Sequence, residues 1–132
     1  MLIRVDLDSP RALYDQVAAS VRSDILAGVL APGDRLPAAR DVAEALDINQ
    51  HTVLHAYQQL RDEGLVDLRR GRGAVIAASA APLAELAHDI DDLVRRAAAL
   101  GVSADTLAGI VRAHRDADTG MRPIENPEED SP

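Results

Sequence analysis

Arginine and glycine alternate in one short segment, and this combination suits the binding of phosphate groups. Guanidinium groups make charge-assisted hydrogen bonds to phosphate oxygens, and glycine lets a backbone turn tightly beside a ligand. The residues concerned are Arg70, Gly71, Arg72 and Gly73. Residues 65–69 and 74–78 flank them with strand-like sequences, so we expect a hairpin with the arginines at its tip. A solvated turn that binds nothing is the simpler alternative.

A second group of polar residues opens a predicted helix. Asn49 is a favourable N-cap and Gly64 a favourable stop, so we expect a helix over residues 50–63. Its buried stripe should consist of Val53, Tyr57 and Leu60. The residues of its first two turns that could face a ligand are Gln50, His51, Thr52, Leu54 and His55.

These side chains suit contacts with DNA. A glutamine amide such as that of Gln50 pairs with adenine, a Thr52 hydroxyl can reach a phosphate, and Leu54 can touch a thymine methyl. The alternatives are that Thr52 only caps or packs and that Leu54 is simply an exposed leucine. His51 and His55 lie one helical turn apart, but two imidazoles do not complete a metal site. We therefore predict neither a metal nor a cofactor.

The elements that would position these groups are also readable. A short helix over residues 38–46 carries Arg40 beside the turn, where it could contact a phosphate or a base edge; a plain surface charge is the alternative. An earlier helix is expected to begin with Ser9 as cap and Pro10 at its first position. Three helices followed by a hairpin predict a winged helix-turn-helix over residues 10–78, whose polar helix enters the major groove of DNA.

Apolar residues repeat every three or four positions along a predicted long helix over residues 83–100. They are Leu83, Leu86, Ile90, Leu93, Ala97 and Leu100. A last helix is expected over residues 103–115. Its inward residues should be Leu107, Ile110 and Val111. We predict that residues 82–115 form a two-helix dimerisation element; packing onto the DNA-binding domain is the alternative.

Two further segments carry no apolar periodicity. Residues 77–81 are small and predict a hinge between the two parts of the chain. Residues 116–132 are acidic and proline-containing, and they predict a disordered tail. The fold class expected is thus mainly α with a small β-wing, a winged helix-turn-helix followed by two C-terminal helices.

Composition excludes several classes of protein. The 132 residues include no Cys, and all 14 basic residues are arginine, which rules out thiol and lysine nucleophiles. No Gly-rich phosphate loop is present, so we predict that the chain is not an enzyme. It shows neither a membrane span nor a signal peptide, which predicts a cytoplasmic protein. The net charge of −8 is unusual for a DNA-binding protein, but residues 80–132 hold most of the acidic excess.

At these residues the chain resembles the GntR family of bacterial transcription regulators. The matching residues are Tyr14, Gln16, Gly28, Pro32, Gly33, Asp34, Leu36, Pro37, Arg40, Thr52, Val53, Ala56, Tyr57, Glu63, Gly64, Leu65, Gly71 and Gly73. The short remainder is similar to the YtrA subfamily, in which two helices replace a large ligand-binding domain. Many family members carry Arg where this chain has Gln50 and Leu54. Ala38 replaces the usual serine cap of the second helix.

The resemblance implies a dimeric repressor that reads two half-sites on double-stranded DNA, with Arg40 and Thr52 near the backbone and Gly71 and Gly73 at the wing tip. Since YtrA-like regulators often lie beside genes for ABC transporters, it also implies an operon that includes transporter genes. A winged-helix module that binds protein instead of an operator is the alternative. A small-molecule effector of unknown identity, acting through the last two helices, stands beside control by the protein's own abundance.

Overall fold

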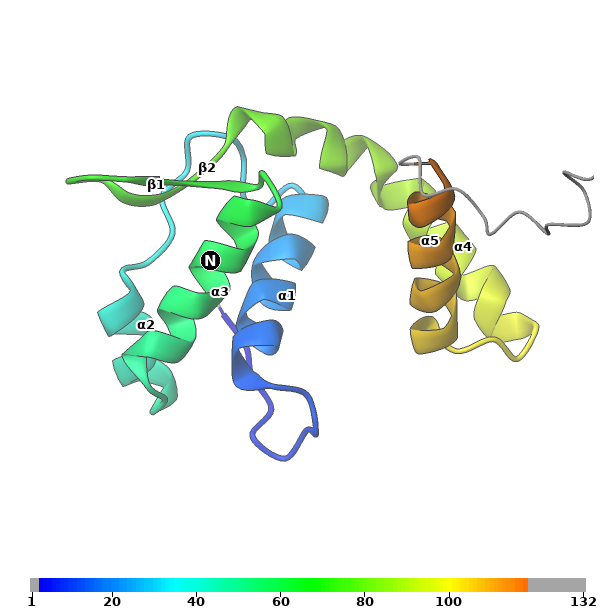
Figure 1. Ribbon diagram of the computed structural model, residues 1–132, viewed down its shortest axis with the longest axis horizontal. Coiled ribbons are helices and arrows are strands. Elements are labelled where there is room, and N and C mark those ends of the chain that lie inside the picture. Colours follow the sequence, from blue (N-terminus) through cyan, green and yellow to red (C-terminus); the bar gives the residue numbers. More distant parts are fainter. Residues whose placement is uncertain (1–2, 119–132) are drawn as a thin grey trace, which may run out of the picture. The chain divides into compact units, whose positions relative to one another are not determined.

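The computed structural model describes residues 3–118, with side chains through residue 114 (Figure 1). In chain order its elements are α1 (Leu13–Leu26), α2 (Ala39–Leu46), α3 (Gln50–Asp62), β1 (Val66–Arg69), β2 (Gly73–Ile76), the 3-10 helix η1 (Ala78–Leu86), α4 (Ala87–Ala99) and α5 (Ala104–Asp118). The chain forms two compact units, and the boundary between them follows Ala87. The fold is the predicted one, a mainly helical winged helix-turn-helix with a two-stranded wing and further C-terminal helices. None of the described helices combines the length and the hydropathy needed to cross a membrane.

The core of the first unit forms where α3 packs against α1 and α2. The expected stripe of α3 is confirmed, since Val53 and Leu60 are fully buried and Tyr57 is 3% exposed. From α1, Val17 and Val21 are fully buried against it. Such aliphatic packing fixes the orientation of α3, because close-packed side chains leave few alternative arrangements.

Local sequence explains the ends of α2 and α3. The Asn49 side chain caps α3 by accepting a hydrogen bond of 2.8 Å from the backbone N–H of His51, as predicted. Gly64, with a φ of 81°, ends α3. Ala38 gives α2 no side-chain cap, also as expected. At the other end of α2, Asp47 adopts a left-handed φ of 55°, which strains a residue that carries a Cβ atom.

The antiparallel hairpin of β1 and β2 pairs Val66 with Ile76 and Arg69 with Gly73. Val66 is buried at the base of β1, whereas Leu68, on the same face two residues nearer the hairpin tip, is 41% exposed. A third segment extends the sheet, because Arg35 forms an isolated antiparallel bridge with Val75. The hairpin is therefore attached both to α3, which precedes it directly, and to the loop before α2.

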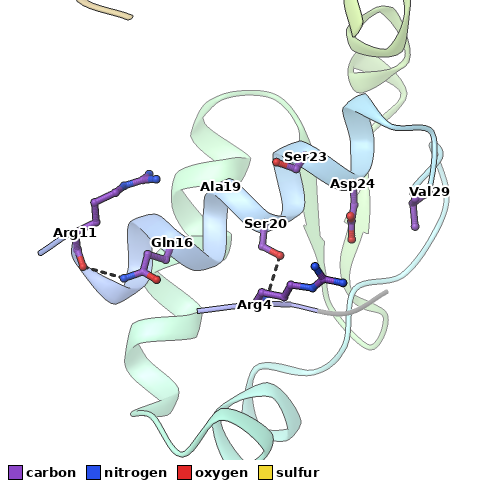
Figure 2. Close-up of a pocket in the computed structure, with 8 residues that line it drawn as sticks. All are labelled: Arg4, Arg11, Gln16, Ala19, Ser20, Ser23, Asp24 and Val29. Atoms are coloured by element: carbon purple, nitrogen blue, oxygen red, sulfur yellow. Dashed lines mark hydrogen bonds between the residues drawn. The ribbon is translucent and has the colours of Figure 1, made fainter. Parts of the chain in front are cut away.

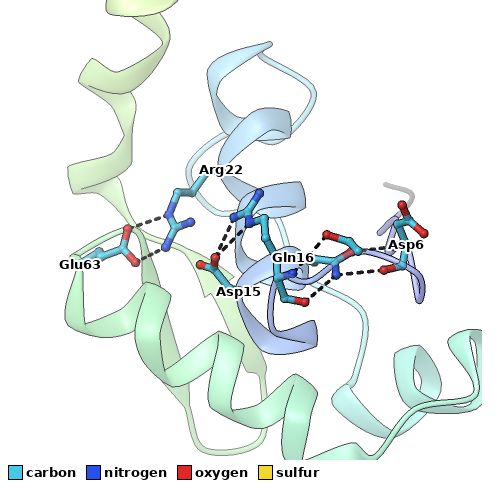
Figure 3. A network of polar contacts seen from close by, with 7 residues as sticks. Asp6, Asp15, Gln16, Arg22 and Glu63 are labelled. Carbon is cyan, nitrogen blue, oxygen red and sulfur yellow. Dashed lines mark hydrogen bonds and ion pairs between the residues drawn. The ribbon is translucent and has the colours of Figure 1, made fainter. Parts of the chain in front are cut away.

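The predicted start of α1 is wrong. The helix begins at Leu13, not at Pro10, and Ser9 does not cap it. The residues before it run along α1 as an arm instead, with Ile3 buried in the core. The Gln16 side chain binds this arm, accepting from the Asp6 N–H at 2.6 Å and donating to the Asp6 carbonyl at 3.0 Å (Figure 3).

The segment predicted to be a hinge is also different. Residues 78–81 are the first turn of the 3-10 helix η1, and Ala80 is only 1% exposed. The Ser79 hydroxyl donates to the Gly64 carbonyl at the end of α3. Leu83, expected on a dimerisation seam, packs against the core of the first unit. Small side chains let this segment pack closely against the first unit. The prediction of a hinge that rotates freely was therefore wrong.

In the second unit, Gly101 ends α4 with a φ of 82°, and Ser103 caps α5 by accepting from the Thr106 N–H at 3.2 Å. Ile110 and Val111, predicted to point inward, are 47% and 55% exposed in this chain. The helix α5 runs to Asp118, so residues 116–118 of the expected tail are helical. The rest of that tail, residues 119–132, lies outside the described residues.

Candidate nucleic-acid interface

An open groove lies between the start of α2, the first half of α3 and the hairpin, all within the first unit. It is lined by Arg35, Leu36, Pro37, Ala38, Ala39, Arg40, Gln50, Leu54, Tyr57, Leu68, Arg69, Arg70, Arg72, Gly73 and Ala74. Segments that are far apart in the sequence thus bring five arginines to one hollow. This concentration of guanidinium groups suits an extended polyanion.

Most of the residues predicted to contact DNA meet in this groove. Arg40 enters from α2, Gln50 and Leu54 enter from α3, and Arg70, Arg72 and Gly73 enter from the hairpin. Gly71 lies at the hairpin tip with a φ of 82°, a conformation that glycine adopts without strain.

Three predicted contact residues of α3 do not line the groove. His51 is exposed at the start of the helix, and Thr52, half-buried, donates its backbone N–H to the Asn49 carbonyl at 3.0 Å. The imidazole of His55 stacks on the ring of Tyr14, with centroids 4.0 Å apart and an angle of 22° between the planes. The imidazole of His55 is therefore held against α1, although His55 as a whole remains exposed to solvent.

Two contacts fix the walls of the groove. The Tyr57 hydroxyl donates to the Pro37 carbonyl at 2.7 Å, which connects α3 to the residues before α2. Burial raises the pKa of Tyr57 well above its ordinary value, so the hydroxyl stays protonated and able to donate. The Leu36 N–H donates to the Ala74 carbonyl at 2.8 Å, which connects the same loop to β2.

Arg35 is a candidate residue that the sequence-based selection missed. Its Nε donates to the backbone carbonyl of Arg72 at 3.2 Å, across 37 positions of sequence. The side chain thus reaches the hairpin tip while its charge stays on the groove wall. Its place in the turn after Asp34 offered no signal, because only the bridge to β2 brings it to the hairpin. Arg69, also missed, lies 3.4 Å from a carboxylate oxygen of Asp67.

The remaining arginines of the groove keep their charge available. Among the residues with described side chains, Arg40, Arg70 and Arg72 take part in no ion pair, whereas Arg22 binds Glu63 through two hydrogen bonds of 2.8 and 2.6 Å (Figure 3). The hydrogen bond with Glu63 raises the pKa of Arg22. Arginine thus has two uses here, a structural one between α1 and the end of α3 and an anion-facing one in the groove.

A second hollow, on the outer side of α1, has a different character (Figure 2). Its lining mixes Arg4 and Arg11 with serines and with Asp24. Arg11 is also neutralised by Asp15 at 2.8 Å. Without a concentration of free cations, this hollow does not suit a polyanion. Nowhere in residues 3–114 do three or more potential metal-ligating side chains gather into a site.

Comparisons with known proteins agree with the geometry. Residues 13–76 match the family model described as "Bacterial regulatory proteins, gntR family". The HTH-type transcriptional repressor YtrA of Bacillus subtilis is 35% identical over 79 residues, which are 60% of this chain and 61% of that protein, less than two thirds of its length. The HTH-type transcriptional regulator Rv1152 of Mycobacterium tuberculosis is 35% identical over 101 residues, 76% of this chain and 84% of that one.

Among solved structures, this chain is similar to YtrA from Sulfolobus acidocaldarius, a GntR-family transcription factor. The identity is 32% and the TM-score is 0.55, over 75% of this chain and 99% of that one. The similarity extends beyond the winged helix-turn-helix in both kinds of comparison.

Proposed function

The chain belongs to the GntR family of DNA-binding transcriptional regulators, and we propose that it acts as a dimeric repressor that reads two half-sites of an operator. The family is one of regulators and not of enzymes. The observation that carries the proposal is the groove that Arg35, Arg40, Arg70 and Arg72 line together with the first half of α3.

Within each half-site, α3 enters the major groove and the hairpin lies beside it. Gln50 is the base-reading residue, since its amide can pair with adenine, and Leu54 contacts a thymine methyl. Arg40 and the hairpin arginines bind phosphates or the minor groove and fix the register without reading sequence. Thr52 contacts a phosphate of the DNA backbone, and His51 and His55 lie on either side of Thr52 in the first turns of α3.

Dimerisation through the C-terminal helices is supported by exposed apolar side chains. On η1, on α4 and directly after α4 these are Leu86, Ile90, Leu93 and Leu100, which are between 38% and 82% exposed; Ala97 on α4 is buried at 7%. Ile110 and Val111 add exposed apolar surface on α5. Apolar surface of this amount in a small unit favours burial against a second copy. Leu83 is left out of this seam because it packs in the first unit.

Repression, and an operon that includes transporter genes, are proposed on similarity alone. The Bacillus relative carries the name of a repressor. A bound dimer over a promoter excludes other proteins by occupancy, and this requires no effector domain. A protein-binding winged helix is the competing function, and it would leave the arginine groove without a polyanionic ligand.

The proposal is tested by footprinting on the DNA upstream of the gene and by sedimentation of the free protein. We expect two protected half-sites about one helical turn apart and a dimer at micromolar concentration. Protection of random and upstream DNA alike would contradict operator recognition. A protein that is monomeric both free and bound to DNA would contradict the two-half-site arrangement.

A further inference from the structure

The groove has an apolar floor that phosphate binding does not require. Leu54 on α3 and Leu68 on β1 line the same hollow and are 37% and 41% exposed. Beneath them lie Leu36, Tyr57 and Ala74, all at most 6% exposed. Covering these exposed leucines with an apolar group is favourable, because it removes their surface from water.

The rim of the groove has the opposite chemistry. Arg35 from the loop before α2, Arg40 from α2 and Arg72 from the hairpin all line it. No ion pair within residues 3–114 neutralises them. A ligand that matches both parts needs an anionic head for the rim and an apolar body for the floor.

We propose that the groove is also a binding site for an amphipathic organic anion, a carboxylate or phosphate monoester with an aliphatic or aromatic body, which competes directly with DNA. The anion takes the arginines that would hold phosphates, and its body covers Leu54 and Leu68. Ligand and DNA exclude one another because they use the same atoms, so release of DNA needs no separate effector domain. The competition rests on the proposed function, whereas the binding of the anion does not.

The first experiment measures binding without DNA, with hexanoate and octanoate as probes in titration calorimetry. Burial of each added methylene should strengthen binding by about two- to fourfold, so octanoate should bind several-fold tighter than hexanoate. Octanol and octylammonium, which have the same chain and no anionic head, should bind at least tenfold more weakly than octanoate. Equal affinity of octanoate and hexanoate, or of octanoate and octylammonium, would overturn the proposal.

A matched pair of variants locates the site. Leu68→Asn removes apolar surface from the floor, whereas Val29→Asn makes the same kind of change at a 59% exposed residue of the other hollow. Both changes are at exposed positions, and thermal unfolding by circular dichroism verifies that both variants fold. We expect octanoate to bind Leu68→Asn at least fivefold more weakly and Val29→Asn unchanged. Equal effects of the two variants would contradict a site in the groove.

The last experiment adds octanoate to the complex of the wild-type protein with its upstream DNA. In direct competition, the octanoate concentration that releases half of the DNA follows from the dissociation constant of octanoate, and it rises as the DNA concentration is raised. A ternary complex of protein, DNA and octanoate would overturn the competition. A protein that binds octanoate but no DNA would contradict the proposed function and leave the ligand site standing, so the two failures are distinguishable.

Discussion

The hydroxyl of Tyr57, in the middle of the recognition helix α3, donates a 2.7 Å hydrogen bond to the carbonyl oxygen of Pro37, just before α2. This bond connects α3, which we propose reads bases, to the loop that carries Arg35 and leads to Arg40. Both residues line the arginine groove, so the bond joins two of its walls.

Tyr57→Phe should lower the free energy of unfolding by about 1 kcal/mol, because the Pro37 carbonyl loses its donor. Urea denaturation measures this change. Tyr14→Phe is the matched control, since its hydroxyl takes part in no hydrogen bond among residues 3–114 and its ring can still stack on His55. A larger loss in the control than in Tyr57→Phe would contradict this role of the bond.

The same residue predicts a loss of stability in alkali. Burial raises the pKa of Tyr57 in the folded protein above its ordinary value of 10. The stabilising contribution is therefore complete below pH 10 and is lost as the pH rises toward the folded pKa, because only the unfolded chain releases the proton. Above pH 10 the free energy of unfolding should fall by up to about 1.4 kcal/mol per pH unit from this group. Tyr57→Phe should show a shallower decline over the same pH range, and parallel curves would refute the assignment.

Salt dependence should separate the groove's arginines from Gln50, the residue proposed to read a base. Arg40→Ala or Arg72→Ala should weaken binding to all DNA sequences and reduce the slope of log affinity against log salt by about 1. Gln50→Ala should cost about 1–3 kcal/mol on the operator and little on random DNA. Fluorescence anisotropy at several salt concentrations measures both effects. An equal loss on the two DNAs would show that Gln50 reads no base.

The left-handed residue at the end of α2 predicts a stabilising substitution. Asp47 has a φ of 55°, so Asp47→Gly should raise the free energy of unfolding by about 1 kcal/mol through relief of strain. Asp47→Ala removes the same carboxylate but keeps a Cβ atom, and it should not stabilise the protein. Gly28→Ala is the reverse control, since Gly28 has a φ of 78° and open space around it; it should destabilise the protein by a similar amount. Equal stabilities of the two Asp47 variants would contradict backbone strain.

Gln16 predicts a local effect on the N-terminal arm. Its amide nitrogen donates to the carbonyls of Asp6 and Arg11, both at 3.0 Å, and Gln16→Glu removes this donor while it adds a charge at a 9% exposed position. We expect a loss of about 1–3 kcal/mol, because two carbonyls lose their donor and face a carboxylate, and faster hydrogen exchange of the Arg4 amide, which donates to Ser20 where the arm lies on α1. Gln58→Glu makes the same change at an exposed position of α3 and should leave that amide unchanged. Unchanged exchange in Gln16→Glu would show that the Gln16 donor does not hold the arm.

The winged helix-turn-helix could be predicted because several local signals agree. Asn49 and Gly64 delimit α3, and the spacing of Val53, Tyr57 and Leu60 identifies its buried face. These signals arise within one helical turn or one stripe, so an isolated sequence contains them. The same reasoning selected six of the residues that line the groove, because a helix face follows from periodicity and a hairpin tip from its glycines.

The errors concern contacts between distant segments. The place of Arg35 depends on its bridge to β2, and the true start of α1 depends on how Gln16 binds the arm. His55 was predicted to be available for contact with DNA, but the ring of Tyr14, from another helix, stacks on it. Propensity and spacing carry no information on such pairings, which only the assembled core provides.

The attachment of η1 decides where this protein can be recombined with others. Ser79 binds the end of α3, and Ala80 and Leu83 complete the core of the winged unit. A chimaera joined directly after the hairpin would leave part of that core behind and would inherit a damaged DNA-binding module. The splice point that respects the structure follows Leu86, where the 3-10 helix gives way to α4 and the packing of the first unit is complete.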